Sequence, residues 1–239
     1  MIYTRRMKKR GPKPKGQVEI RWSPEFAYAV GLLVADGCLS KDKRHIDLTS
    51  KDRVQVTLFR TCLGLATKIS RKRSGAGNVA YHTQFGDVLF YRFLEGIGLT
   101  PAKSKTISSV SIPKKYFIDF LRGYFDGDGS SYSYCDSVHE RSYRFYISFT
   151  SASPRFLDWL RGEVGDALGI RGSLGYNRNN SYVQLKYSKK EAAVLARNMY
   201  YAEGLPCLRR KRLKIMKSMR IIEASRSGET GRRAAFRAQ

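Results

Sequence analysis

The sequence predicts an α+β protein made of two similar halves, in which helices alternate with β-hairpins. A mostly apolar segment that ends in Asp-Gly occurs twice, as FAYAVGLLVADG at 26–37 and IDFLRGYFDGDG at 118–129. Each copy is followed by β-branched and aromatic residues in partial alternation, and then by apolar residues at helical spacing. The same elements return in the same order, so each half has the pattern helix, hairpin, helix, hairpin, helix.

The elements after each repeated segment can be placed by their periodicity. In the first half they are a strand, an amphipathic helix, a second strand region and a further helix, at 45–50, 54–65, 67–84 and 87–97. Their counterparts in the second half lie at 143–151, 157–168, 170–187 and 189–201. Ser153-Pro154 is a favourable N-cap and first-turn pair, and Ser188 with Glu191 has capping-box spacing.

Basic segments flank the two halves, which we expect at 22–112 and 113–217. Residues 1–21 carry eight Lys or Arg and one Glu, together with a Gly-Pro-Lys-Pro-Lys-Gly run, which predicts a flexible basic arm. Residues 218–239 are basic and rich in Ser, Gly and Ala, which predicts a poorly ordered tail. Four widely separated cysteines predict reduced thiols, neither a zinc site nor a disulfide frame.

The charge balance indicates a polyanionic partner. The chain has 45 Lys and Arg against 20 Asp and Glu, a formal net charge of +25. Such an excess is self-repelling unless a polyanion neutralises it, and nucleic acid is the first candidate, although a ribosomal-type binder or an anionic membrane surface would fit the same number. The sequence contains no uninterrupted run of about 20 apolar residues, so it predicts no membrane span. The N-terminus lacks the apolar core of a secretory signal, so we expect an intracellular, non-secreted protein.

Each repeated helix carries small residues four positions apart, Gly31 with Ala35 and Gly123 with Gly127. Such a stripe lets two helix backbones approach closely. A single segment of this kind is most simply a tightly packed core helix. Two copies predict that the helices pack against each other.

Each repeated helix also ends in an acid. Asp36 and Asp128 precede Gly37 and Gly129, which suit the left-handed residue that terminates a helix. A carboxylate is disfavoured in the last turn because the helix C-terminus carries partial negative charge, and pairing the helices adds repulsion between the acids. Divalent cations between them would remove both penalties. Carboxylates, backbone carbonyls and water are ligands that suit Mg²⁺.

These segments resemble the LAGLIDADG motif of homing endonucleases, with AVGLLVADG at 29–37 and LRGYFDGDG at 121–129 in register with its nine positions. The resemblance covers roughly residues 22–217. It implies two pseudo-symmetric αββαββα halves with antiparallel β-saddles and a central two-helix interface. It further implies a monomeric, site-specific endonuclease, because two motifs lie in one chain. Such an enzyme recognises a long asymmetric site in double-stranded DNA and cuts both strands across the minor groove, leaving short 3′ overhangs.

The resemblance assigns Asp36 and Asp128 as metal ligands, with the carbonyls of Ala35 and Gly127 as helpers. It implies Mg²⁺ as cofactor, with Mn²⁺ as a substitute and Ca²⁺ supporting binding without cleavage. The second motif keeps an additional acid, Asp126, where the first has an apolar residue. That position usually concerns packing or capping, so we interpret Asp126 as structural.

Both halves also close with a Leu and, six residues later, a Lys: Leu99 to Lys105 and Leu205 to Lys211. A lysine from this region reaches the active site in the family, so Lys105 and Lys211 are candidates to offset charge on the phosphate. Taken singly, a lysine in a basic protein is usually solvated. The neighbouring Lys103 and Arg210 are alternative occupants.

Three further residues resemble the family position that supplies a water-positioning side chain and an adjacent lysine: Ser50, Lys51 and Ser151. The second half has Ala152 where the first has Lys51, so we expect an asymmetric site that cuts the two strands at different rates. Alternatively, Ser50 and Ser151 are helix N-caps.

The remaining candidates are side chains of the strand regions, where Arg and Gln can read base edges while Lys and Tyr more often hold phosphates. In the first half these are Lys41, Lys43, Arg44, Lys68, Arg71, Arg73, His82 and Gln84. In the second half they are Tyr132, Tyr134, Arg141, Arg144, Arg171, Tyr176, Arg178, Gln184 and Lys186. The arm at 5–15 would add affinity that is largely independent of sequence.

Two other functions fit the same pattern. The chain could be an intron RNA maturase, an RNA-binding splicing cofactor, because the charge suits RNA equally well. It could also be a catalytically silent DNA-binding protein on the same scaffold. Loss of a metal-binding acid would favour either one, but both Asp36 and Asp128 are present. The endonuclease is therefore the preferred interpretation.

Overall fold

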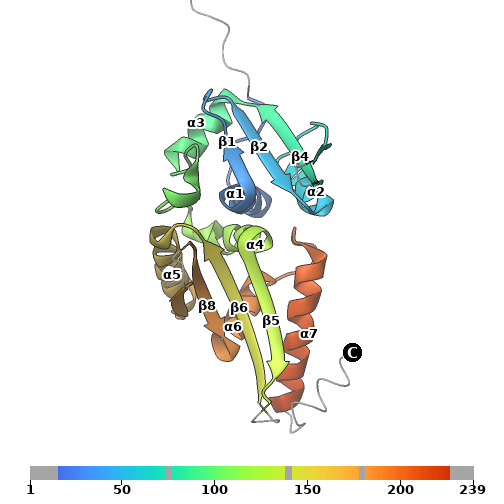
Figure 1. The fold of residues 1–239 in the computed structure, drawn as a ribbon, viewed down its shortest axis with the longest axis vertical. Helices are drawn as coiled ribbons and strands as arrows, with labels where there is room; N and C mark the ends of the chain where they lie inside the picture. Colours follow the sequence, from blue (N-terminus) through green and yellow to red (C-terminus); the bar gives the residue numbers. More distant parts are fainter. Residues whose placement is uncertain (1–15, 74–76, 138–141, 178–180, 227–239) are drawn as a thin grey trace, which may run out of the picture.

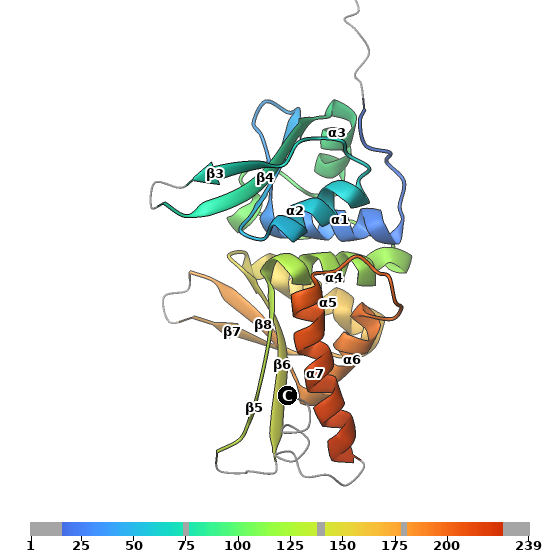
Figure 2. The same cartoon turned by 90° about the vertical axis from the view of Figure 1, so that its right-hand side faces the viewer.

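The computed structural model describes residues 16–73, 77–137, 142–177 and 181–226. Two halves lie one above the other along the long axis of the molecule (Figures 1 and 2). Each half has one β-sheet, and a helix from each half lies at the centre, where the two helices run side by side. None of the described helices is long and apolar enough to cross a membrane.

The element order agrees with the order that the sequence predicts. The first half contains α1 (Pro24–Asp36), β1 (Gly37–Leu39), β2 (His45–Ser50), α2 (Arg53–Cys62), β3 (Ser70–Arg73), β4 (Val79–Gly86) and α3 (Val88–Gly96). Two 3₁₀ turns, Lys103–Lys105 and Lys114–Tyr116, follow it. The second half contains α4 (Phe117–Asp128), β5 (Gly129–Cys135), β6 (Tyr143–Ser151), α5 (Pro154–Leu168), β7 (Ser173–Tyr176), β8 (Val183–Ser188) and α6 (Lys189–Met199). A final helix, α7 (Arg209–Arg226), has no counterpart among the described elements of the first half.

The two sheets have equivalent antiparallel topologies. Their strand orders are β1-β2-β4-β3 and β5-β6-β8-β7. The first strand of each sheet starts at the glycine after a repeated helix, with Gly37 opposite Leu48 and Gly129 opposite Phe149. The β5–β6 hairpin pairs seven residues whereas β1–β2 pairs three, so the second sheet extends further from the centre.

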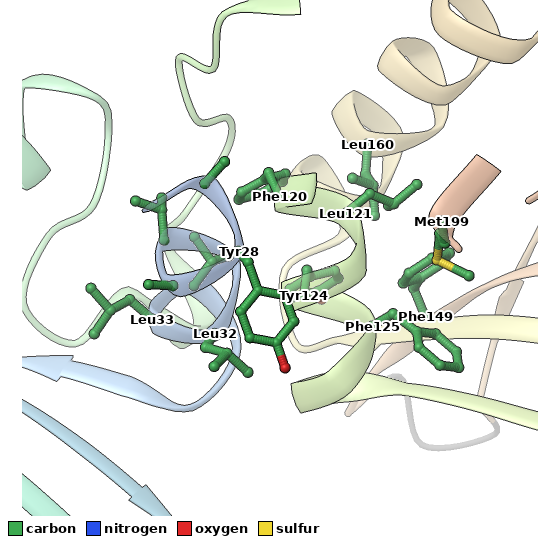
Figure 3. Close-up of a cluster of buried hydrophobic side chains, with 14 of the residues drawn as sticks. Tyr28, Leu32, Leu33, Phe120, Leu121, Tyr124, Phe125, Phe149, Leu160 and Met199 are labelled. Carbon is green, nitrogen blue, oxygen red and sulfur yellow. The ribbon is translucent and has the colours of Figure 1, made fainter. Parts of the chain in front are cut away.

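The predicted close packing of the small-residue stripes is confirmed. A Cβ added at Gly31 or Gly123 would lie 2.2 or 2.0 Å from a backbone oxygen of the opposite helix, and one added at Gly127 would lie 2.2 Å from the Cβ of Ala35. The backbones of α1 and α4 are therefore in contact. Figure 3 shows the larger side chains beside this contact, with Tyr28 of α1 reaching toward α4 near Tyr124.

The predicted left-handed conformation of Gly37 and Gly129 is wrong. Both residues are extended, with φ of −82° and −85°. Glycine is required there for space, because an added Cβ would lie 2.6 Å from the carbonyl oxygen four residues earlier in both helices. The chain turns at these glycines directly into β1 and β5, which places the acids at the point where helix and strand meet.

One of the two predicted helix caps is confirmed. The Ser153 Oγ accepts a hydrogen bond from the Phe156 amide at 3.4 Å. Ser188 is the N-cap of α6, but its side chain makes no capping bond, and the Glu191 carboxylate accepts instead from the amides of Arg171 and Gly172. The capping box is therefore wrong, because Glu191 is used to hold the loop before β7.

Residues 16–21 and 218–226 are more ordered than predicted. The amides of Gln17 and Val18 donate to Asp87, at the start of α3, and Val18 is buried. At the other end α7 continues to Arg226, so a poorly ordered tail from Ser218 is wrong for 218–226. The physical reason is an apolar face, which packs on β5, β6 and α6; its buried members are Ile215, Met219, Ile221 and Ile222. Residues 1–15 and 227–239 lie outside the described part of the chain.

Candidate active site

The two motif acids lie together at the C-terminal ends of α1 and α4. Asp36 is half-buried and Asp128 is exposed, and a Cβ placed on Gly127 would be only 3.1 Å from Asp36 Oδ2. The contact between Gly127 and Ala35 holds the C-terminal ends of α1 and α4 together. The repeat therefore assembles two carboxylates from residues that are 92 positions apart in the sequence.

A lysine caps each of these helix ends. Lys103 is buried and donates to the carbonyl of Gly37, whereas Lys105, the predicted residue, is exposed. Equal spacing from a leucine favoured Lys105, but the 3₁₀ turn Lys103–Lys105 turns the alternative occupant, Lys103, toward the site. Lys211 is placed as predicted, with its Nζ 2.7–3.3 Å from the carbonyl oxygens of Phe125, Asp126, Gly127 and Gly129.

Polar side chains of the first half form a relay to Asp36. The Gln55 Nε2 donates to Asp36 Oδ2, the Ser50 hydroxyl donates to Gln55 Oε1 at 3.0 Å, and the Asp52 amide donates to Ser50 Oγ at 3.1 Å. Sequence reasoning missed Gln55. It is a buried polar residue on the amphipathic helix α2, and apolar periodicity carries no signal for such a position.

An open pocket of about 880 Å³ lies over this relay. Lys51 lines it, exposed to solvent, and so does Arg210, whose Nε donates to Asp52 at 2.9 Å across the two halves. The N-cap alternative for the two serines is wrong. Asp52 caps α2 through the Val54 amide, and Ser153 caps α5. Ser151 instead accepts from the Ser153 amide at 3.1 Å, beside a separate cavity on the Asp128 side.

Asp126 has a structural position. It is 1% exposed, and its Oδ2 accepts from the Tyr28 hydroxyl at 2.7 Å and from the Leu208 amide at 2.6 Å. Its Oδ1 has no hydrogen-bond partner among the described residues. These bonds connect α1, α4 and the chain segment before α7, which agrees with the structural interpretation.

The four charged groups act on one another. Burial raises the pKa of Asp36, against the hydrogen bond from Gln55 and the charges of the two lysines. Desolvation by the surrounding helix ends, followed by the charge of Asp36, raises the pKa of Asp128 to about 6, although the surface of the side chain remains open to solvent. Burial lowers the pKa of Lys103, and it lowers that of Lys211 to about 8. The folded protein therefore disfavours the charged forms of the two carboxylates and the two lysines. A bound cation would stabilise the carboxylates, and a bound phosphate would stabilise the lysines.

The donors at this site fit a divalent cation of the Mg²⁺ type. Asp36 and Asp128 supply two carboxylates, and the carbonyls of Ala35 and Gly127 lie next to them; the Gly127 carbonyl is 3.3 Å from Lys211 Nζ and retains a second lone pair. The described residues contain no group of three or more His, Cys, Asp or Glu side chains arranged to hold a metal. The protein therefore provides a partial ligand shell, which water and phosphate oxygens would complete.

The outer face of each sheet, opposite the core, carries polar and aromatic side chains. Strand pairing places seven predicted residues on it: His82, Gln84, Tyr132, Tyr134, Arg144, Gln184 and Lys186. Arg71, Arg73 and Tyr176 are exposed, but they lie on the other face of their sheets, because they pair with Tyr81, Val79 and Val183. Lys72 and Tyr146 take outward positions that the sequence reading missed.

Aromatic and charged contacts organise this face. Tyr146 stacks on Tyr132, with ring centroids 4.9 Å apart, and on Tyr134 at 6.3 Å, while the Lys186 Nζ lies 5.3 Å from its ring. In the first half Asp47 binds both Lys72 and His82 at 3.2 Å.

The other candidates lie in loops or turns. Those described are exposed: Lys41, Lys43, Arg44, Lys68 and Arg171. Arg141 and Arg178 lie outside the described residues.

Comparisons with known proteins agree with this architecture. Residues 118–200 match the family model of the LAGLIDADG-like domain. A comparison with curated protein sequences gave no match. Among solved structures, the chain resembles the LAGLIDADG homing endonuclease I-LtrWI bound to target DNA, with a TM-score of 0.60, 12% identity, and coverage of 90% of this chain and 96% of that one.

Two further solved structures are similar to the chain. I-SmaMI bound to uncleaved DNA in the presence of calcium ions matches with a TM-score of 0.59 and 13% identity over 91% of this chain and 98% of that one. Full-length WhiA from Thermatoga maritima matches with a TM-score of 0.55 and 17% identity over 90% of this chain and 66% of that one. The protein thus has the α+β LAGLIDADG fold of the homing endonucleases, and its second half contains a LAGLIDADG-like domain.

Proposed function

We propose that the protein is a monomeric, metal-dependent endonuclease that binds a long asymmetric site in double-stranded DNA and cuts both strands at the junction of its two halves. The observation that carries the proposal is the pair of carboxylates, Asp36 and Asp128, held together at two helix ends where each charge is disfavoured. Packing alone does not call for acids at these positions, because the close helix contact is made by the small residues. A metal-dependent reaction gives both acids a role.

The residues divide the chemistry between them. Asp36 and Asp128, with the carbonyls of Ala35 and Gly127, would hold the cations. Bound divalent cations supply positive charge to the scissile phosphates and lower the pKa of attacking water. Lys103 and Lys211 add positive charge next to the carboxylates, which offsets charge that develops on the phosphate.

DNA would lie along the outer faces of the two sheets. Arg144, Gln84 and Gln184 supply donors suited to base edges. The tyrosine cluster Tyr132, Tyr134 and Tyr146 supplies hydroxyls and ring surface for phosphates and sugars. The net charge of +25 provides the sequence-independent part of the affinity. Homing endonucleases of the same fold are bound to DNA in their solved structures, one of them to uncleaved DNA with calcium ions, which supports double-stranded DNA as the partner and divalent metal use.

Cleavage of a randomised DNA library tests the proposal. The wild type should make double-strand breaks with short 3′ overhangs at one sequence in Mg²⁺ or Mn²⁺, and should bind that sequence without cutting it in Ca²⁺. Asp36→Asn and Asp128→Asn should each bind and fail to cut. Asp158→Asn, at an exposed position on α5, is the matched control and should cut normally. Selective binding with no cleavage by the wild type in Mg²⁺ would refute the enzyme.

A DNA-binding protein without nuclease activity is the second candidate. Two observations favour it. WhiA, which is not named as an endonuclease, shares the fold. In addition, the Lys211 Nζ is already surrounded by four carbonyl oxygens. The same library experiment separates the two functions, because a silent binder would select a sequence and leave it intact in every metal.

A further inference from the structure

The two motif acids have different neighbours in corresponding positions. Asp36 is oriented by Gln55, which is 3% exposed and is itself held by Ser50. One carboxylate oxygen is therefore committed to the amide, which fixes the direction in which the other oxygen points. A ligand held in this way is pre-oriented for a cation or a water molecule.

The second half begins the same arrangement and does not complete it. Ser151 accepts from an amide two residues later at 3.1 Å, just as Ser50 does. Five residues after Ser50 stands Gln55, but five residues after Ser151 stands Phe156. Phe156 is 1% exposed and can donate no hydrogen bond. Among the described residues, no side chain donates a hydrogen bond to Asp128.

The spaces beside the two acids differ in size and in the residues that lie next to each carboxylate. On the Asp36 side the open pocket of about 880 Å³ is lined mainly by polar and charged residues. On the Asp128 side a cavity of about 260 Å³ has a partly apolar wall, formed by Val34, Ile107, Tyr124, Ala152 and Phe156. The Phe156 ring contacts Tyr124 edge-on, with centroids 5.1 Å apart. Polar groups line both spaces, including Lys103, Ser104 and Thr150 on the Asp128 side, but of the two acids only the Asp36 carboxylate receives a hydrogen bond from a neighbouring side chain among the described residues.

We infer that the two strands are cut in a fixed order, with the strand whose phosphate lies at Asp36 cut first, and that Gln55 is the positioning residue that sets this order. The inference rests on the proposed endonuclease function and adds a direction to it. Gln55 acts through Asp36, which it orients, and the second half lacks that function because Phe156 occupies the position. Loss of a residue that orients a metal ligand typically costs about 10- to 100-fold in activity, so the strand bias should be of this order.

Single-turnover cleavage of a duplex labelled separately on each strand tests the inference in Mg²⁺. The wild type should cut one strand about 10-fold faster than the other and accumulate a nicked intermediate. Gln55→Met, which keeps the length of the side chain and removes the amide, should slow the fast strand about 10-fold or more and leave the slow strand within about 2-fold, so that the bias collapses. Ser50→Ala, one step further along the relay, should slow the same strand by less. Val54→Met, on the exposed face of the same helix, is the matched control and should change neither strand.

The outcomes separate the two proposals. Equal rates in the wild type, or equal slowing of both strands by Gln55→Met, would overturn the inference and leave the endonuclease intact, because a merely structural role of Gln55 cannot change the ratio between strands. Absence of cleavage on both strands with binding retained would overturn the endonuclease and the cutting order together. Phe156→Gln is the reciprocal variant: where its thermal unfolding remains cooperative, it should accelerate only the slow strand.

Discussion

The contact between α1 and α4 makes a quantitative prediction for Gly123→Ala. The added Cβ would lie 2.0 Å from the Tyr28 carbonyl oxygen, and 2.8 and 3.0 Å from its carbonyl carbon and Cα. Since real Cβ atoms do not approach within 3.0 Å, the helices must separate by about 1 Å. A gap of that size forfeits a quarter to a half of the dispersion energy along the contact. Overpacking of this kind costs about 3 kcal/mol, from which about 1 kcal/mol of improved helix propensity is subtracted. The expected net loss is about 2 kcal/mol.

Urea unfolding of Gly123→Ala and Gly162→Ala measures this effect against a matched control. Gly162 lies inside α5, and a Cβ added there meets nothing within 4 Å. Gly162→Ala should therefore gain about 0.5–1 kcal/mol, as an unhindered helical substitution does. The same chemical change thus has opposite signs at the two positions. A Gly123→Ala variant as stable as the wild type, alongside the expected gain at Gly162, would show that the two backbones are not in contact.

Three further predictions concern the charges at the site and the chain end. Asp128→Asn should stabilise the metal-free protein at pH 7.5. Raising the pKa of Asp128 from 3.8 to about 6 lowers the free energy of unfolding by up to about 3 kcal/mol. Because the side chain is exposed, solvent screening reduces the expected gain to about 1 kcal/mol. Because the folded pKa is the higher one, wild-type stability falls as pH rises from about 4 to 6, and urea unfolding in EDTA should show the Asn gain disappearing below about pH 4. Lys103→Met should abolish cleavage and Lys105→Met should keep it within about 2-fold, as a solvated lysine would; similar losses in both would contradict the placement of Lys103. Ending the chain at Lys217 removes three buried apolar side chains worth about 6 kcal/mol together, so this truncation should unfold or aggregate in calorimetry, and an unchanged melting temperature would show that 218–226 is dispensable.

Local periodicity predicted most of the fold. The repeated apolar segments and the alternation that follows them correspond to α1, β2, α4 and β6, with ends within a few residues of those expected. The small-residue stripes predicted the helix contact because steric size is read directly from sequence. The end of α7 was missed, since its apolar residues lie in a segment whose composition is otherwise basic and rich in small residues.

The site was predictable where it depends on the repeat and unpredictable where it depends on tertiary packing. Asp36 and Asp128 follow from motif position alone. Lys103 could not be preferred over Lys105, because a turn of 3₁₀ helix decides which lysine faces inward. The role of Gln55 depends on the distance from α2 to the end of α1, which no local pattern encodes. For the same reason the outward faces of β3 and β7 were assigned with the wrong parity, since register is set by pairing with β4 and β8.

Lys211 contributes to the stability of the fold as well as to the proposed chemistry. Lys211 satisfies carbonyl oxygens at the C-terminus of α4, a helix end that carries partial negative charge and an acid besides. Removing it takes a charged donor away from these carbonyl oxygens, of which Phe125 O keeps the Gly129 amide, and a hydrogen bond to a charged group is worth about 1.5–3 kcal/mol. Lost cleavage in Lys211→Met alone would therefore not identify a role in catalysis. The informative comparison adds Mg²⁺ and target DNA at a temperature where the variant is folded: a lysine that only caps the helix leaves the cleavage rate of the folded fraction unchanged, whereas one that offsets phosphate charge lowers that rate.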